Sequence, residues 1–134
     1  MSPEQLADIN ELYEAMSRHD MDGLRALGER YPDHRWRNAP DMPETAERVG
    51  TASALAYVEE LFATFDRIET EVLDVIEVGP DEVIFAVRHR VRGARSGAWG
   101  ERHEAHLWRA RDGSIVSMEE FVSVEEARAA AGVA

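Results

Sequence analysis

The feature that most constrains this chain is a change in the period of its hydrophobic pattern. Apolar residues recur at helical spacing through most of the first half and alternate with polar residues through most of the second half. A period near 3.6 residues predicts amphipathic helix, and a period of two predicts half-buried strand. Helices followed by strands indicate an α+β fold, in which a curved sheet folds over the N-terminal helices and forms a pocket. At 134 residues the chain is long enough for one domain with a hydrophobic core and too short for two, so residues 1–134 are expected to form a single domain.

Local signals place three helices before the long strands. Ser2 and Gln5 form a capping box at the start of the first helix. A short second helix is expected over residues 21–27, and Thr51 is a suitable N-cap for a third. Residues 39–50, just before that third helix, contain two prolines and are predicted to form a loop.

Period-two alternation predicts five strands, followed by a short helix capped by Ser123. The strands are expected over residues 34–38, 67–78, 83–91, 101–111 and 114–122. Successive side chains of a strand point to opposite faces of its sheet, so Phe85, Val87 and His89 share one face.

Composition excludes several classes of partner and reaction. The formal net charge of −12 argues against nucleic acid and anionic membranes as partners. All 15 basic residues are arginine, so Schiff-base catalysis through lysine is excluded, and there is no cysteine to form a disulfide or act as a nucleophile. No apolar run approaches the ~18 residues that a membrane-spanning helix needs. Because the N-terminus also lacks the features of a signal peptide, a cytoplasmic protein is expected.

Three stretches carry a resemblance to a known family. They are Ser-Arg-His-Asp-Met-Asp-Gly-Leu at 17–24, Gly-Thr-Ala-Ser-Ala-Leu at 50–55, and the pair Ala-His-Leu-Trp at 105–108 and Gly-Ser-Ile-Val-Ser-Met at 113–118. In this order they resemble the nuclear transport factor 2-like superfamily, and within it the SnoaL-like polyketide cyclase and ketosteroid isomerase branch. The resemblance implies a cone-shaped, antiparallel or mixed sheet wrapped around the N-terminal helices, a hydrophobic pocket, and a homodimer formed through the outer face of the sheet. It does not fix the reaction, because the superfamily includes isomerases, cyclases, dehydratases and non-enzymes.

The catalytic trio of ketosteroid isomerase is not matched. That enzyme uses a tyrosine on the first helix, a carboxylate base at the end of the first strand, and a protonated carboxyl on the second-last strand. The resemblance places Leu12 at the tyrosine position and Ala105 at the position of the second donor. The base position falls on Asn38, or on Ala39 if a gap is placed differently. Tyr13 is one residue away, about 100° around the helix, and is not expected to substitute, so steroid isomerisation by that mechanism is rejected.

Three residues are the candidate catalytic groups, namely His89, His103 and Glu120. The resemblance places the face of His89 toward the pocket, and His103 is its cross-strand neighbour if the hairpin turns near Ser96. Two imidazoles in an apolar cavity favour one neutral ring, which can abstract a proton α to a carbonyl. Glu120 points inward if Met118 does, and can orient a histidine or act as the base itself. The alternative is that His89 only fills the pocket wall and that Glu120 is a solvated carboxylate at a strand end.

The expected ligand is a small hydrophobic molecule, and no cofactor is expected. Trp36 could stack on a flat ligand or simply pack in the core, and Asn38 could hydrogen-bond a carbonyl. The full set of expected ligand-binding residues is Trp36, Asn38, Met42, Tyr57, Phe62, Phe85, Val87, Leu107 and Met118.

No metal site is expected. His103 and His106 are three residues apart on one strand and so face opposite sides of the sheet, where they cannot bind one ion. His34, His89 and His103 would converge only if three strands brought them together.

A stripe of arginines is expected on the outer face of the sheet, with acidic residues beside it. The arginines are Arg88, Arg90 and Arg92, and the acidic candidates are Glu69, Glu71 and Glu104. They could form cross-strand ion pairs worth ~0.2–1 kcal/mol each, or part of a dimer interface.

Two functions therefore remain open. The first is a cofactor-independent isomerase, cyclase or lyase that applies acid–base chemistry to a hydrophobic carbonyl compound. The second is a non-catalytic domain that binds an apolar ligand or another protein, which the missing isomerase trio favours. The side chains that line the inner wall distinguish the two.

Overall fold

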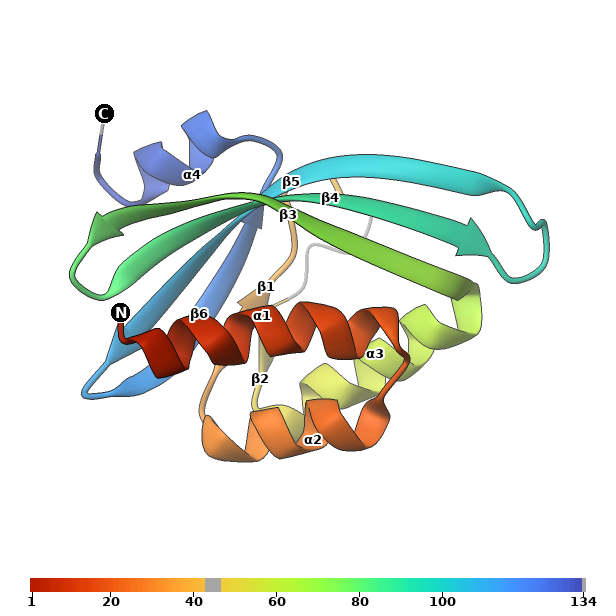
Figure 1. Cartoon of the computed structure of the whole chain (residues 1–134), viewed down its shortest axis with the longest axis horizontal. Coiled ribbons are helices and arrows are strands. Elements are labelled where there is room, and N and C mark those ends of the chain that lie inside the picture. Colours follow the sequence, from red (N-terminus) through yellow and green to blue (C-terminus); the bar gives the residue numbers. More distant parts are fainter. Residues whose placement is uncertain (43–46, 134) are drawn as a thin grey trace.

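The computed structural model describes residues 1–42 and 47–133 and confirms the α+β fold (Figure 1). Its elements are α1 (Pro3–Ser17), α2 (Met21–Arg30), β1 (Arg35–Arg37), β2 (Glu47–Val49), α3 (Thr51–Thr64), β3 (Phe65–Gly79), β4 (Glu82–Gly93), β5 (Trp99–Arg111), β6 (Ser114–Phe121) and α4 (Val124–Ala130). No helix among the described residues is long and apolar enough to cross a membrane.

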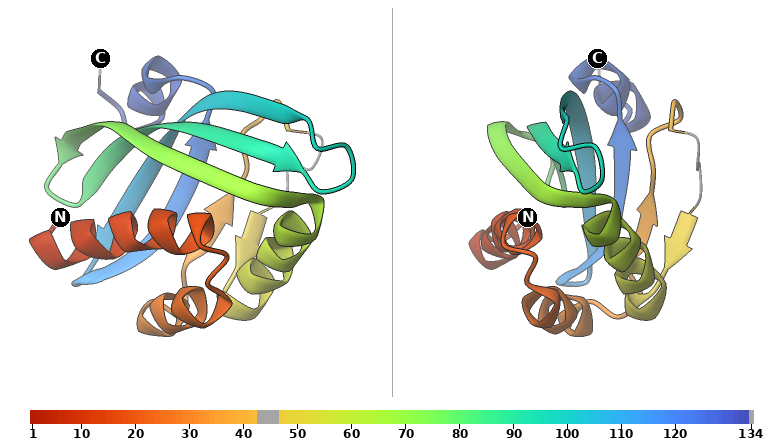
Figure 2. Two further views of the ribbon diagram at one scale, coloured as in Figure 1. Left: turned by 45° about the vertical axis from the view of Figure 1, so that its right-hand side comes forward. Right: turned by 90° about the vertical axis from the view of Figure 1, so that its right-hand side faces the viewer.

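Six strands form one mixed sheet in the described part of the chain, in the order β2-β1-β6-β5-β4-β3. β1 runs parallel to β6, and the other neighbouring pairs are antiparallel. The long strands bend over α1, α2 and α3, whereas α4 packs on the opposite face (Figures 1 and 2). β2 and β3 are the two edges, so the sheet is curved but open rather than a closed cone.

Capping and close helix contact explain how the helical layer forms. The capping box of Ser2 and Gln5 is present at the start of α1. The prediction that Thr51 caps α3 is wrong, because Gly50, with φ of +85°, occupies the N-cap position. Thr51 instead donates its hydroxyl to the carbonyl of Gly28 at 2.9 Å. A side chain on Gly28 would collide with Thr51, so glycine allows α2 and α3 to approach.

Alternation along the strands builds two cores, one on each face of the sheet. The inner core joins Tyr13 of α1 to Phe85, Val87 and Trp108 on the concave face. The outer core packs beneath α4 and consists of the buried residues Ile84, Ala105, Leu107 and Ala127. The expectation that Leu107 lines the pocket is therefore wrong, because its side chain lies on the α4 side.

The register of the β4–β5 hairpin differs by one residue from the expected pairing. Arg102 lies opposite His89, and His103 lies opposite Arg88. β4 extends to Gly93 and β5 begins at Trp99, so the connection is shorter than the gap between the strands predicted over residues 83–91 and 101–111. A shift of one residue exchanges the two faces of a strand. His103 is consequently exposed on the outer face, whereas Glu104 is buried on the inner face.

A short strand was not expected in the loop predicted over residues 39–50. β2 pairs with β1, and Glu47 on β2 accepts hydrogen bonds from Arg35 and Arg37. β2 has only three residues, and just one of them, Val49, is apolar, so it shows no period-two alternation that would have predicted a strand. Residues 43–46 of that predicted loop lie outside the described residues.

Candidate active site

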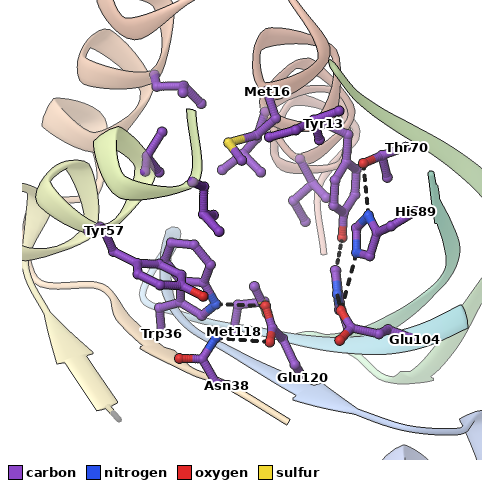
Figure 3. Close-up of a pocket in the computed structure, with 18 of the residues that line it drawn as sticks. Tyr13, Met16, Trp36, Asn38, Tyr57, Thr70, His89, Glu104, Met118 and Glu120 are labelled. Atoms are coloured by element: carbon purple, nitrogen blue, oxygen red, sulfur yellow. Dashed lines mark hydrogen bonds and ion pairs between the residues drawn. The ribbon is translucent and has the colours of Figure 1, made fainter. Parts of the chain in front are cut away.

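A cavity of about 420 Å³ lies between the helices and the concave face of the sheet. Helices α1, α2 and α3 contribute mainly aliphatic side chains, including Ile9, Leu12, Met16, Leu24 and Leu55. Polar groups are concentrated on the strands opposite them, where Glu104 and Glu120 point into the same cavity from β5 and β6 (Figure 3). Such a pocket, apolar with a few convergent polar groups, is typical of small-molecule sites.

The first polar group is a hydrogen-bonded chain that we call the Glu104 network, made of Tyr13, Thr70, His89, Glu104 and His106. Oε1 of Glu104 lies 2.9 Å from Nε2 of His106 and 3.2 Å from Nε2 of His89. The remaining ring nitrogens are also bonded, since Nδ1 of His89 lies 2.9 Å from the Thr70 hydroxyl and Nδ1 of His106 lies 2.7 Å from the Tyr13 hydroxyl. The network spans α1, β3, β4 and β5.

Hydrogen-bond directions in the network follow from Trp108. Its indole nitrogen can only donate, and it donates to the Tyr13 oxygen at 3.0 Å. Tyr13 therefore has its single proton available for Nδ1 of His106, whose Nε2–H then donates to Glu104. Burial raises the pKa of Tyr13, so its hydroxyl stays protonated. The arrangement holds His106 between a hydroxyl and a carboxylate.

Glu104 is ionised although its side chain is almost fully buried. Burial alone would raise the pKa of Glu104, but the hydrogen bonds from His106, His89 and Arg102 outweigh this effect and hold its pKa well below the ordinary value. Nε of Arg102 donates to Oε2 of Glu104 at 2.6 Å, and its two terminal nitrogens bond Asp41 at 2.7 and 3.0 Å. Hydrogen bonding to Arg102 lowers the pKa of Asp41. A complete set of partners is what allows a carboxylate to remain charged in this position.

The second polar group surrounds Glu120. Trp36 donates its indole N–H to Oε2 at 3.0 Å, while the Asn38 amide and the Ala39 backbone N–H both donate to Oε1 at 3.2 Å. Arg48 donates to the Asn38 side-chain oxygen and lies over the Tyr57 ring, 3.5 Å from its centroid. Among the described residues Oε2 accepts one hydrogen bond and Oε1 accepts two, which leaves accepting capacity on Oε2.

The two groups are side by side on the sheet. His106 and Glu120 are directly opposed in the β5–β6 register, and Met118 and Trp108 form the next inward-facing pair. Opposed side chains on one face have Cβ atoms about 4.5–5.5 Å apart. A ligand in the cavity can therefore contact a carboxylate and a hydroxyl–imidazole pair at once.

The structure brings most of the predicted site residues to this cavity. Those that line it are His89, Glu120, Trp36, Asn38, Met42, Tyr57 and Met118. Phe85 and Val87 face inward but are buried in the inner core and do not line the cavity, and Phe62 packs against Leu24 and Val58 and stacks on His19.

His103 and Glu104 exchange the positions that were expected for them. His103 does not face His89, and Glu104 does not join the outer arginine stripe. Both errors have one cause, the single-residue shift in the hairpin register.

Sequence reasoning missed Tyr13, Glu104 and His106 as site residues. The difference of about 100° around α1 did not turn Tyr13 away from the site, because Leu12 and Tyr13 both border the cavity. Ala105, expected at the position of the second donor, is buried on the outer face, and the inward-facing positions beside it are Glu104 and His106. The correct register alone would have indicated both of these residues, since His106 was already expected to face away from His103.

Comparison with known proteins agrees with this architecture. A profile of the SnoaL-like domain matches residues 9–118, which is most of the chain. The chain belongs to the SnoaL-like family. A search of curated proteins found no match.

Solved structures show that this SnoaL-like chain has a widely shared fold. An NTF2-like protein of unknown function from Burkholderia pseudomallei is 23% identical over 96% of this chain and 97% of its own, with a TM-score of 0.75. A candidate SnoaL-like polyketide cyclase from Jannaschia sp. CCS1 is 20% identical over 100% of this chain and 97% of its own, with a TM-score of 0.73. A Mycobacterium tuberculosis protein in complex with estradiol-17β-hemisuccinate is 17% identical over 90% of this chain and 94% of its own, with a TM-score of 0.71. At these identities the likeness establishes the fold, and the chemistry has to be argued from the site.

Proposed function

We propose that this SnoaL-like protein binds a hydrophobic carbonyl compound in its cavity and transfers a proton at the carbon α to the carbonyl. The observation that carries the proposal is the placement of Glu120 beside the Glu104 network at the wall of an otherwise apolar cavity. The fold relative that holds a steroid hemisuccinate supports a flat, oxygenated ring compound as the ligand class.

Glu120 is the proposed base. Its carboxylate is held by donors from Trp36, Asn38 and Ala39, which fix its orientation. Oε2 keeps accepting capacity, and apolar walls strengthen the interaction between a carboxylate and an acidic C–H bond. In this step the α-carbon loses its proton to Glu120, and the electron pair moves to the carbonyl oxygen as an enolate.

Tyr13 and His106 are the proposed stabilisers of the enolate oxygen. When His106 is neutral, Tyr13 directs its proton to Nδ1 of His106. When Nδ1 of His106 takes up a second proton from water, Nδ1–H donates to the Tyr13 oxygen, and the tyrosine O–H is then available for the ligand. Glu104 stabilises the charged ring, and His89, which contacts the same carboxylate oxygen, is a second group able to hold a proton. Glu120 then returns the proton to the substrate, which completes an isomerisation or an exchange.

Proton exchange tests the proposal without knowledge of the natural substrate. A panel of bicyclic and tricyclic aromatic ketones in D2O is followed by NMR for deuterium incorporation at the α-carbon. The protein is expected to accelerate exchange for at least one ketone, and Glu120→Gln to slow it by about 100-fold or more, because general base catalysis contributes 10²–10⁴-fold. His103→Gln is the matched control, since it changes an imidazole on the outer face. Equal exchange in the presence and absence of protein, or undiminished exchange with Glu120→Gln, would contradict the proposal.

One observation favours a binding function without chemistry. Each ring nitrogen of His89 and His106 already has a hydrogen-bond partner within the chain. Saturable binding of the same ketones, with no exchange above the protein-free rate, would support this second candidate.

We also propose that the outer face of the sheet forms a homodimer. Trp99 is 45% exposed there, and the guanidinium groups of Arg90 and Arg92 lie over its ring at 4.8 and 5.7 Å. Tryptophan and arginine are enriched at the centres of protein interfaces. Sedimentation should show a dimer at micromolar concentration that Trp99→Asp dissociates, and a monomeric wild-type protein would contradict it.

A further inference from the structure

We propose that His89, Glu104 and His106 bind a divalent transition-metal ion of the zinc type. One ligand atom from each residue lies within 4.8 Å of the other two. Two imidazoles and one carboxylate are a donor set that binds Zn²⁺ and Fe²⁺ in proteins. His106, which sequence reasoning left out of the pocket, is the residue that makes this set possible.

The three ligand atoms converge with little rearrangement. Nε2 of both histidines points at the same atom, Oε1 of Glu104, at 2.9 and 3.2 Å. In the ion-free network this geometry is held by the two Nε2–H groups, which donate to the carboxylate. An ion placed among the three atoms would replace those two protons and bind the Nε2 lone pairs.

The outer hydrogen bonds suit the tautomers that a metal requires. A histidine that binds through Nε2 carries its proton on Nδ1 and donates it to a fixed acceptor. The Thr70 hydroxyl, 2.9 Å from His89 Nδ1, and the Tyr13 hydroxyl, 2.7 Å from His106 Nδ1, are both able to accept. The same hydroxyls therefore support the network with or without an ion.

The charges around the three ligands are compatible with a cation. Oε2 of Glu104 is bonded to Arg102, so the carboxylate would bind the ion through Oε1 alone. Asp41 is paired with Arg102 and offsets its charge. His89, Glu104 and His106 all border the cavity, so a further coordination position is open to water or to a ligand oxygen.

The donor types predict which ions bind. Imidazole nitrogen suits zinc, iron, nickel and cobalt, whereas magnesium and calcium prefer all-oxygen sites. Ion binding goes beyond the proposed proton transfer, because it is measured without a substrate and does not involve Glu120. A protein that exchanges ketone protons but binds no ion would overturn the metal site and leave the proposed function standing.

The test is titration of chelator-treated protein with Zn²⁺ by calorimetry and with Co²⁺ by visible absorption. We expect one ion per chain with micromolar or tighter affinity, a Co²⁺ spectrum showing nitrogen ligation, and no binding of Mg²⁺ under the same conditions. His89→Gln should abolish tight binding, and the isosteric Thr70→Val should weaken it about 10–100-fold, the usual cost of losing a partner of a ligating histidine.

The control variant is His103→Gln, three residues from His106 on the same strand and exposed on the outer face. It should bind Zn²⁺ as tightly as the wild type. Circular dichroism confirms that each variant is folded. Absence of tight binding in the wild type, or equal losses in His103→Gln and His89→Gln, would overturn the site.

Discussion

The two faces of strands β4 and β5 carry the same kinds of residue in opposite circumstances. On the outer face, Arg88 pairs with Glu71 and Arg92 pairs with Asp66, and all four side chains are substantially exposed. On the inner face, the Glu104 side chain is only 5% exposed and has three charged or polar partners. Exposed ion pairs stabilise the fold only weakly and are screened by salt. A buried charge, by contrast, needs all of its hydrogen-bond and charge partners to offset the cost of removing it from water. The comparison shows that the pairing register of β4 and β5, rather than the type of residue, decides which charged side chains lie exposed on the outer face and which lie buried beside the cavity.

Removal of the inner carboxylate should have the largest effect on stability. Glu104→Ala leaves Arg102 and two histidines without their shared acceptor in a buried site. We expect a loss of about 3–5 kcal/mol in the free energy of unfolding, measured by urea denaturation. A loss below about 1 kcal/mol would mean that the inner and outer faces do not differ as described.

Loss of the Tyr13 hydroxyl should have an intermediate effect. Tyr13→Phe keeps the ring in the inner core but leaves the Trp108 indole N–H and His106 Nδ1 without their partner. The expected loss is about 1–3 kcal/mol, the cost of unsatisfied buried polar groups. Tyr31→Phe is the matched control, because its hydroxyl bonds Asp8 at a partly buried position, and it should destabilise less. Equal losses in the two variants would contradict the assigned role of Tyr13.

A change on the outer face should have a small effect that depends on salt. Glu71→Gln removes the carboxylate charge that pairs with Arg88, and both side chains of this pair are exposed. The expected loss is about 0–1 kcal/mol, decreasing further at high ionic strength. A loss as large as that of Glu104→Ala in the same denaturation experiment would break the comparison.

The smallest effect should appear in the pH dependence of stability. Burial lowers the pKa of His34 below its ordinary value of 6.5, so the unfolded chain binds this proton at a higher pH than the folded chain does. Stability should therefore fall as the pH decreases through about 6.5 toward the folded-state pKa. His34→Gln should show a shallower fall between about pH 7 and pH 5, and an identical fall in both proteins would exclude His34 as its source.

Much of the fold followed from local sequence signals. The capping box follows from the three-residue spacing of Ser2 and Gln5. The order of the elements and the inward direction of His89 and Glu120 follow from periods of 3.6 and two residues, which the sequence displays directly. The pairing of β4 with β5 depends instead on how many residues form the turn, and that number is not fixed by alternation. The predicted register was wrong by one residue, so His103 was placed on the inner face instead of Glu104, and His106 was not recognised as a site residue.

Tyr13 and β2 were missed for other reasons. The apolar face of α1 is broad enough that Leu12 and Tyr13 both reach the cavity, so an angular difference of about 100° did not exclude either. β2 is only three residues long and pairs with arginine-rich β1 through polar contacts, without the apolar alternation that signals a strand.

NMR of the histidine ring nitrogens tests the inner network most directly. In uniformly ¹⁵N-labelled protein treated with chelator, His89 and His106 should show Nε2–H protons that exchange slowly with water, and the isosteric Glu104→Gln should shift the ring resonances of both histidines. The ring N–H protons of His103 should exchange rapidly with water, and its resonances should not change in Glu104→Gln. If His106 instead exchanges as freely as His103, or does not respond to Glu104→Gln, then the buried network does not exist and the site built on it is wrong.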